Sequence, residues 1–337
     1  MRVLITGIGG FIGFNVAMKL VISYKDWEIV GLDKISYCSS QKSIDMLSEH
    51  SNFKFIKCDL VDLNALKKIY NLYNFDYVLH FAAYTHVDHS FGDSIIYTTN
   101  NVIGTHNLLE VMRANIEESE NNESVNKMKK YIHVSTDEVY GTTTEYTDEK
   151  SILKPTNPYA ATKAAAEMLV QSYIESYGLP AIITRGNNVY GPYQYPDKVI
   201  PRFLIRLMRD LKLEIQGDGS QIRSFLYVDD VANAFVKILS EGVIGEIYNI
   251  GTDEEKTILE VANESIDITG RDMTYIEHVT DRKFNDKRYF IDSSKLTELG
   301  WNPENTFEMG LKKTYDWYVE EGMTHWTESQ LEAALKI

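Results

Sequence analysis

The sequence predicts an α/β fold with a parallel, doubly wound sheet and a smaller mixed α/β lobe toward the C-terminus. Short apolar, β-branched runs recur through the first half of the chain, at 3–5, 29–32, 53–56, 77–79, 131–134 and 181–184. Between them lie apolar stretches with helical spacing, at 11–22, 63–72, 102–112 and 160–177. This alternation is typical of βαβ units, because parallel strands need a crossover connection that a helix usually provides.

The length of 337 residues suits a large domain with a smaller lobe. We assign residues 1–190 to the sheet domain, with later segments returning to it, 191–325 mainly to the lobe, and 326–337 to a tail. The alternation fades after Gly191, so a helix at 228–239, a strand at 247–250 and a helix at 307–318 are expected in the lobe. The polar, acidic stretch 115–130 is expected to be a solvated excursion.

The composition excludes several classes of function. A net charge of -15 argues against binding nucleic acid or an anionic membrane, because phosphate groups repel an acidic surface. The N-terminus lacks a signal-peptide pattern, and no apolar stretch approaches the roughly 18 to 20 residues of a membrane helix. Cys38 and Cys58 have no metal-like spacing and favour a reducing compartment. We therefore expect a cytoplasmic protein without a metal site.

Three glycines mark a candidate phosphate-binding turn. Gly7, Gly10 and Gly13 follow the first strand directly, where the first helix begins. Glycine lets the backbone approach a pyrophosphate, whose charge the helix N-terminus favours. Asp33 ends the second strand, 20 residues beyond Gly13, where a carboxylate can bind the adenosine ribose and repel a 2′-phosphate. The pattern favours NAD, although Lys34 leaves room for NADP and a purely structural turn would show the same glycines.

Tyr159 and Lys163 lie one helical turn apart on the same face of a predicted helix. A tyrosine has a pKa of about 10, and a neighbouring ammonium group can lower it. Tyr159 could then accept a hydroxyl proton while hydride leaves the same carbon. The spacing is common by chance, and alone it is more often structural than functional.

A second set of polar residues, Thr136, Asp137 and Glu138, follows the strand at 131–134. In open α/β sheets, ligands bind beyond the carboxyl ends of the strands. Two adjacent carboxyl groups there suit an elimination, in which one removes a carbon-bound proton and the other protonates the departing hydroxyl. The alternative is that Thr136 or Asp137 caps a helix whose first turn contains Glu138.

Together these motifs resemble the extended short-chain dehydrogenase/reductase family and, within it, the nucleotide-sugar 4,6-dehydratases, which carry Thr-Asp-Glu beside Tyr-x-x-x-Lys. The resemblance runs from Met1 to about Trp326 and includes further segments at 32–34, 80–83, 85–88 and 187–192, Arg223 with 226–228, and 281–282 with 285–289. It implies a Rossmann-type domain, bound NAD and a homodimer formed through the helices at 102–112 and 160–177. The acidic pair argues against a 4-epimerase or decarboxylase, and the complete set argues against a catalytically silent scaffold.

The resemblance also implies a role for each residue. Tyr159 takes the proton of the sugar 4-hydroxyl, which Thr136 positions, as hydride passes from C4 to NAD. Glu138 then removes the C5 proton, Asp137 as a neutral acid protonates the leaving 6-hydroxyl, and hydride returns to C6. The cofactor residues that are expected on this basis are Gly7, Gly10, Phe11, Ile12, Gly13, Asp33, Lys34, Asp59, Leu60, Phe81, Ala82, Ala83, Tyr159 and Lys163. The expected substrate residues are Thr85, Thr136, Asn188, Lys198, Val199, Pro201, Arg223, Asn249, Arg282 and Tyr289.

The choice of nucleotide rests on finer features. Ser224 stands where bacterial dTDP-glucose enzymes usually have Asp, and Asn285 stands where they usually have His. The segments 33–39, 184–192 and 284–286 resemble more closely the dehydratase domain of plant rhamnose synthases, which acts on UDP-glucose. We therefore expect UDP-glucose as the substrate, with dTDP-glucose as the alternative.

Overall fold

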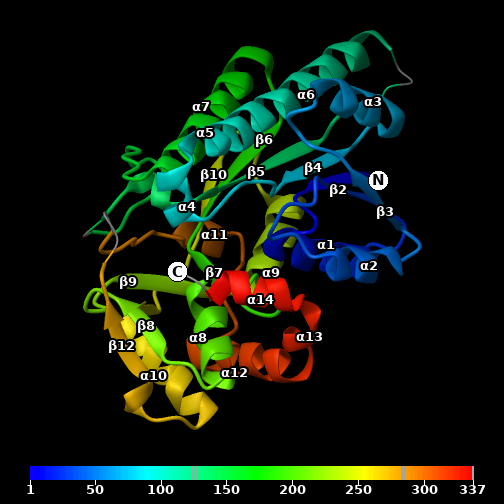
Figure 1. Cartoon of the computed structure of the whole chain (residues 1–337). Coiled ribbons are helices and arrows are strands. Elements are labelled where there is room, and N and C mark those ends of the chain that lie inside the picture. Colours follow the sequence, from blue (N-terminus) through cyan, green and yellow to red (C-terminus); the bar gives the residue numbers. More distant parts are fainter. Residues whose placement is uncertain (123–124, 126, 144, 282–285, 336–337) are drawn as a thin grey trace.

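A seven-stranded parallel sheet forms the centre of the computed structural model, which describes residues 1–335 apart from 123, 124, 126, 144 and 282–285 (Figure 1). The strand order is β10-β6-β5-β4-β1-β2-β3. Their bounds are β1 Arg2–Thr6, β2 Glu28–Asp33, β3 Phe53–Lys57, β4 Tyr77–His80, β5 Lys130–Thr136, β6 Ala181–Gly186 and β10 Ile247–Ile250. The chain runs outward from β1 to β3 and returns to β4 on the other side of β1, which confirms the predicted doubly wound α/β fold.

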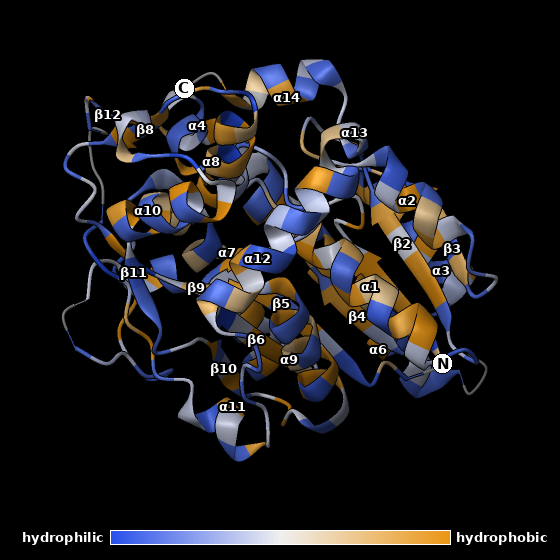
Figure 2. Cartoon of the chain, turned by 90° about the horizontal axis from the view of Figure 1, so that it is seen from below, coloured by the Kyte–Doolittle hydropathy of each residue, from blue (hydrophilic) through white to orange (hydrophobic). Residues whose placement is uncertain are grey.

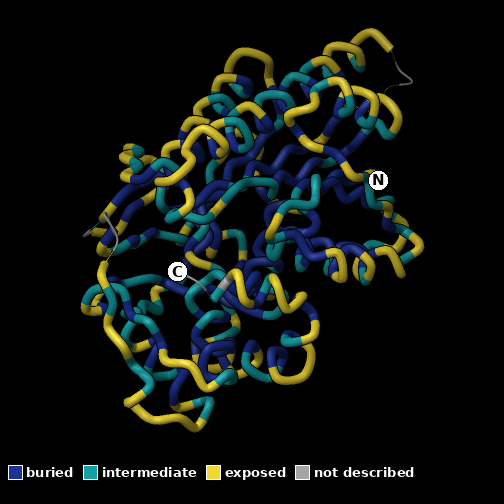
Figure 3. Tube along the Cα trace, in the orientation of Figure 1, coloured by how far each residue is buried: buried dark blue, intermediate teal, exposed yellow. Residues whose placement is uncertain are grey.

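Helices cover both faces of this sheet. One face packs against α1 Phe11–Ser23, α2 Gln41–Ser48 and α9 Val228–Glu241, and the other against α3 Leu63–Tyr73, α6 Gly104–Asn121 and α7 Pro158–Tyr177. Alternation along β1 shows why: Val3 and Ile5 belong to the first core, whereas Leu4 belongs to the second. Hydrophobic residues concentrate on the strands and on the helix faces toward them (Figure 2), and the sheet is buried while the outer helices are partly exposed (Figure 3).

The smaller lobe has its own core and two short sheets. One sheet has the order β11-β9-β7, and the other pairs β12 with β8. The core includes Phe203, Ile215, Val261 and Phe307. The elements of the lobe are β7 Asn188–Tyr190, α8 Val199–Met208, β8 Leu213–Gln216, β9 Ile222–Tyr227, β11 Glu255–Thr257, α10 Ile258–Thr269, β12 Ile276–Val279 and α12 Phe307–Trp317.

Two expectations about organisation are wrong in detail. The strand at 247–250, expected in the lobe, is β10, which pairs in parallel with β6, and the helix at 228–239 is α9, which packs on the large sheet. Short apolar runs fit either place, and only their long-range partners decide between them. The expected excursion at 115–130 is also too long, because α6 continues to Asn121 and both Asn115 and Met128 are buried.

The C-terminal segment packs against both domains. His325 Nε2 forms a hydrogen bond of 2.7 Å with Ser40 Oγ at the start of α2, and the Trp326 ring lies 5.2 Å from that of Tyr195.

The remaining elements are α4 Val87–Gly92, α5 Ser94–Tyr97, α11 Ser294–Glu298, α13 Met323–His325 and α14 Glu328–Leu335, with 3₁₀ turns at Asp137–Tyr140 and Met273–Tyr275 and π-helical turns at Thr98–Ile103 and Tyr318–Gly322. None of the described helices is both long and apolar enough to cross a membrane.

Candidate active site

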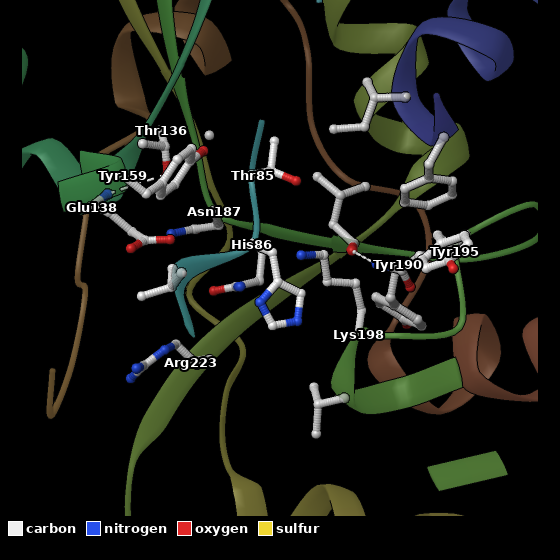
Figure 4. Close-up of a pocket in the computed structure, with 18 of the residues that line it drawn as sticks. Thr85, His86, Thr136, Glu138, Tyr159, Asn187, Tyr190, Tyr195, Lys198 and Arg223 are labelled. Atoms are coloured by element: carbon white, nitrogen blue, oxygen red, sulfur yellow. Dashed lines mark hydrogen bonds between the residues drawn. The ribbon is translucent and has the colours of Figure 1, made fainter. Parts of the chain in front are cut away.

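A cavity of about 410 Å³ lies between the carboxyl edge of the large sheet and the smaller lobe. Its walls come from the glycine turn before α1, the end of β5, the start of α7, and α8, β8 and β9 of the lobe. Figure 4 shows Thr136, Glu138 and Tyr159 grouped at one side, with Arg223 and Lys198 reaching in from the lobe. The cavity therefore brings the predicted phosphate-binding turn and both predicted catalytic motifs together.

The glycine turn provides an open backbone cradle. Gly7 has φ +71°, and a Cβ atom there would lie 2.7 Å from the backbone nitrogen of Ala82, while one on Gly13 would lie 2.6 Å from the Gly7 carbonyl oxygen. Gly10 precedes α1, and no side chain caps that helix. The amide groups of its first turn thus remain available to an anion at the positive end of the helix dipole. Phe11, Ile12, Phe81 and Ala83 also line the cavity, whereas Ala82 packs beneath Gly7.

Asp33 lies beside this turn, and its carboxylate already accepts several hydrogen bonds from the protein. Its carboxylate accepts hydrogen bonds from Gly9 N at 3.0 Å, Ile35 N at 2.7 Å and Ser39 Oγ at 3.0 Å. Lys34 and Asp59, whose Nζ and Oδ2 atoms are 3.5 Å apart, line a second cavity beyond the ends of β2 and β3. Leu60 is buried next to that cavity. The glycine cradle and this line of polar groups along the sheet edge fit an extended dinucleotide.

Tyr159 and Lys163 are buried on the first turns of α7. Asn157 caps this helix by accepting a hydrogen bond from Ala160 N at 2.8 Å, and Pro158 is the first helical residue. Lys163 Nζ donates to the Val134 carbonyl oxygen at 2.6 Å. Burial lowers the pKa of Lys163 to about 8, although the Glu167 carboxylate one turn further opposes this effect.

Lys163, expected to lower the pKa of Tyr159, is not among the groups that shift it most in this arrangement. Burial raises the pKa of Tyr159 well above its usual range, and the nearby Glu138 carboxylate raises it further. A side-chain hydrogen bond with Thr136 lowers it, but burial outweighs that bond.

The acidic pair forms the 3₁₀ turn that follows β5. Asp137 Oδ2 accepts a hydrogen bond from Asn187 Nδ2 at 2.7 Å, and Glu138 Oε2 accepts one from Asn157 Nδ2 at 3.0 Å. Burial raises the pKa of Asp137 to about 7, with the Asn187 hydrogen bond opposing it, and burial also raises the pKa of Glu138. Asp137 can thus hold a proton near neutral pH, beside a second carboxyl group whose pKa burial also raises.

The capping interpretation of Thr136 holds alongside the catalytic one. Thr136 Oγ1 accepts a hydrogen bond of 3.3 Å from Glu138 N, so its side chain caps the turn. The same oxygen donates to Asp137 Oδ1 at 3.2 Å. Asn157 and Asn187, which hold the carboxyl groups, were not among the predicted site residues. The only local signal for Asn157 is its position before Pro158 at a helix start.

The predicted substrate residues divide into three groups. Thr85, Asn188, Lys198, Val199, Arg223 and Tyr289 line the cavity with Thr136. Pro201 is buried in α8, and Asn249 is buried outside the cavity, where it accepts a hydrogen bond from Tyr140 Oη at 2.9 Å and donates to two backbone carbonyls. Asn249 therefore supports the structure behind the site rather than contacting a ligand. Arg282 lies outside the described residues.

The lobe also contributes residues that the motifs did not identify. Glu214 and Gln216 of β8 line the cavity together with Gln221, Asp197 and Tyr195. Arg223 packs over the ring of Tyr289 at 4.7 Å, and Tyr289 Oη donates to Asp286 Oδ2 at 2.6 Å. A guanidinium group and the Lys198 ammonium group in one wall suit an anionic ligand such as a diphosphate.

The family model of GDP-mannose 4,6 dehydratase matches residues 4–314. The chain belongs to this family. The resemblance to nucleotide-sugar 4,6-dehydratases is therefore confirmed.

Relatives within this dehydratase family are similar over most of the chain. A trifunctional UDP-glucose 4,6-dehydratase/UDP-4-keto-6-deoxy-D-glucose 3,5-epimerase/UDP-4-keto-L-rhamnose-reductase of Arabidopsis thaliana is 48% identical over 95% of this chain and 47% of its own length. The chain thus spans about half of that relative. A dTDP-D-glucose 4,6-dehydratase of Mus musculus is 45% identical over 94% of this chain and 88% of its own.

A solved structure extends the similarity to the fold. DesIV, a dTDP-glucose 4,6-dehydratase from Streptomyces venezuelae crystallised with NAD, matches with a TM-score of 0.90 and 35% identity, covering 98% of this chain and 100% of its own. The named relatives are all nucleotide-sugar 4,6-dehydratases, which are hydro-lyases.

Proposed function

We propose that the protein is an NAD-dependent nucleotide-sugar 4,6-dehydratase, which converts a nucleoside-diphosphate glucose to its 4-keto-6-deoxy derivative. The observation that carries this proposal is the pair Asp137 and Glu138, the first buried and the second half-buried, which line one cavity with Tyr159 and are held by separate amide groups. An oxidation alone needs only Tyr159 and Lys163. The acidic pair adds an acid and a base, which elimination of water requires.

The cofactor would lie along the carboxyl edge of the large sheet. The glycine cradle at Gly7, Gly10 and Gly13 would hold the pyrophosphate, and Asp33 would face the adenosine ribose. Bound NAD would accept hydride from the sugar and later return it. Lys163 would keep its ammonium group beside the nicotinamide half, anchored by the Val134 carbonyl.

The elimination step follows from the environments of the two carboxyl groups. Once C4 is a ketone, the C5 hydrogen is acidic, and Glu138 removes it as the base. Asp137, whose pKa is about 7, is the group that can hold a proton near neutral pH and give it to the leaving 6-hydroxyl. The nearby Arg223 guanidinium lowers the pKa of both carboxyl groups and so helps to keep Glu138 ionised.

Two further features support the remaining parts of the proposal. The outer helices α6 and α7 lie side by side (Figure 1), and Met168 and Tyr177 of α7 are exposed, so this face could form a homodimer. The cysteines Cys38 and Cys58 are both free, which supports a reducing, cytoplasmic location.

We infer that UDP-glucose is the preferred substrate, with dTDP-glucose as the second candidate. A thymine methyl group contributes only about 1 to 3 kcal/mol to discrimination, so overlap is expected unless the site also binds the ribose 2′-hydroxyl. The test incubates the protein with each nucleotide sugar and measures product mass and kcat/KM. We expect a product lighter by one water and a higher kcat/KM with UDP-glucose. A product of unchanged mass would indicate an epimerase, and a preference for dTDP-glucose would reverse the choice of nucleotide.

A further inference from the structure

The segment that follows Asp33 lies between the two cavities of the structure. Residues 34–36 line the second cavity, and Tyr37 and Cys38 line the first. A dinucleotide that extends from the glycine turn to Asp33 would lie against this segment. We therefore call residues 34–40 the cofactor loop.

The cofactor loop contains a strained backbone position. Ile35 has φ +60°, in the left-handed region that a β-branched side chain rarely adopts. Such a conformation persists only where surrounding contacts hold it. Within the loop, Ile35 N and Ser39 Oγ both donate to Asp33 Oδ1, at 2.7 and 3.0 Å. The placement of the Asp33 carboxylate thus depends on the conformation of the loop.

A histidine from the C-terminal segment holds the end of this loop. His325 Nε2 lies 2.7 Å from Ser40 Oγ and 3.2 Å from Ser43 Oγ. Ser40 Oγ already accepts a hydrogen bond from Ser43 N at 3.1 Å, so its own hydrogen is available for donation to the imidazole nitrogen. Ser40 N in turn donates to the Gly9 carbonyl oxygen at 2.8 Å. These bonds link the C-terminal segment to the glycine turn.

Aromatic rings fix the imidazole of His325 on its other sides. The ring centroids of Tyr193, Trp317 and Trp326 lie 5.3, 5.5 and 4.9 Å from it. Trp317 belongs to the core of the smaller lobe, and the exposed fractions of His325 and Ser40 are only 8% and 4%. Figures 1 and 2 both show α13, which ends at His325, next to α2. A buried contact thus attaches the cofactor loop to the lobe.

Two further contacts attach the same segment to the loop and to α2. Gln330 Nε2 donates to the Tyr37 carbonyl oxygen at 3.3 Å, and Lys42 Nζ donates to the Thr324 carbonyl oxygen. Both join exposed groups, which exchange readily with water. The buried contact of His325 is therefore expected to contribute the most.

We propose that His325 is a positioning residue for the cofactor, which acts through Ser40 to hold the cofactor loop against the glycine turn and thereby slows the release of NAD. This inference rests on the proposed function, in which one NAD molecule must stay bound from the beginning of a turnover to its end. NAD leaves when the loop moves away from it, and the buried contact opposes that movement.

The test measures how fast NAD leaves the intact protein. The protein is loaded with radiolabelled NAD, an excess of unlabelled NAD is added, and the bound label is followed over time. We expect H325A to release the label at least about tenfold faster than the wild type does, because one buried contact that holds the loop is lost. Melting temperature and the amount of NAD bound per chain are measured for each variant.

Three matched variants show whether the contact itself matters. H325Q keeps a polar group near the position of Nε2 and should retain slow release. H325N is too short to reach Ser40 and should release NAD as fast as H325A. H278A removes a histidine of β12 whose Nδ1 lies 2.8 Å from the Gly217 carbonyl oxygen, and it should behave as the wild type.

A double-mutant cycle separates the contact from the other role of Ser40, which caps α2. S40A alone should speed release, because it removes both the cap and the partner of His325. In S40A/H325A the two effects should combine to less than their product, since the second substitution has no contact left to remove.

The outcomes separate this inference from the proposed function. Wild-type release from H325A, equally fast release from H325Q and H325A, or independent effects of S40A and H325A would overturn the role of His325 and leave the dehydratase proposal intact. A wild type that holds NAD but dehydrates no sugar nucleotide would overturn the proposed function, and a wild type that binds no NAD would overturn both. If H325A does not fold, the comparison of H325N with H325Q provides the same test.

Discussion

The buried charges around Arg185 and those around Asp137 are compensated in different ways. Arg185 donates to Glu167 Oε2 from Nε at 3.0 Å and from Nη2 at 2.7 Å, so two opposite charges neutralise each other away from the cavity. Asp137 and Glu138 carry the same sign, and a neutral asparagine amide holds each of them. The first arrangement fixes the charges permanently, whereas the second leaves protons able to move.

Two buried lysines, Lys130 and Lys163, show the same difference. Lys130 Nζ donates to three backbone carbonyls at the end of α9, at 3.1, 2.8 and 2.9 Å, and thereby uses all its hydrogens. Lys163 lines the cavity, and its described contacts include one such hydrogen bond, to the carbonyl oxygen of Val134. A lysine whose ammonium group donates all its hydrogens to the protein thus has a structural role. A lysine at the edge of a cavity that donates only some of them is placed for a chemical role.

Replacing Glu138 by Gln should have the largest effect on catalysis. The substitution keeps the size of the side chain and removes the base, so dehydration should fall by about 1,000-fold while reduced cofactor accumulates. Rapid-mixing absorbance measurements during one turnover would show this directly. Normal dehydration in E138Q would require another residue to act as the C5 base.

The matched substitution in the other region, E167Q, should act mainly on stability. It leaves the Arg185 guanidinium buried without its counter-charge, which typically costs about 3 to 5 kcal/mol of unfolding free energy. Urea denaturation measures this loss. If E167Q and E138Q lost the same small amount of stability, the distinction between the two regions would fail.

D137N is expected to have a smaller effect on the free energy of unfolding than E167Q, and to increase it rather than lower it. Burial raises the pKa of Asp137 from 3.8 to about 7, so the folded state binds this proton more tightly than the unfolded state does. The stabilisation is present below the unfolded pKa and is lost as the pH rises through about 7. D137N does not ionise, so its stability relative to the wild type should increase from about pH 4 to about pH 7 and then level off. A pH-independent difference in urea midpoint would contradict the assignment.

Sequence reasoning performed best where function depends on local spacing. The glycine turn, the pair Tyr159 and Lys163, and the adjacent carboxyl groups are each defined by residues within one or two turns of chain, so their grouping follows once the strand order is known. The open α/β sheet then brings them to one edge.

Contacts between distant segments could not be predicted in this way. Asn187 lies 50 residues from the Asp137 carboxylate that it holds, and Asn249 lies 109 residues from Tyr140. A resemblance placed Asn249 near the substrate, yet its side chain is fully buried and its amide is satisfied within the protein. The rise in the pKa of Tyr159 was also missed, because burial depends on packing that the i, i+4 spacing does not describe.

The most direct test of the central claim follows the hydride. UDP-glucose carrying deuterium at C4 is converted by the purified protein, and the product is examined by mass spectrometry and NMR. We predict a product that has lost one water and carries the deuterium at C6, because the same bound cofactor accepts and returns it within one site. Deuterium retained at C4, or a product of unchanged composition, would contradict the dehydratase account.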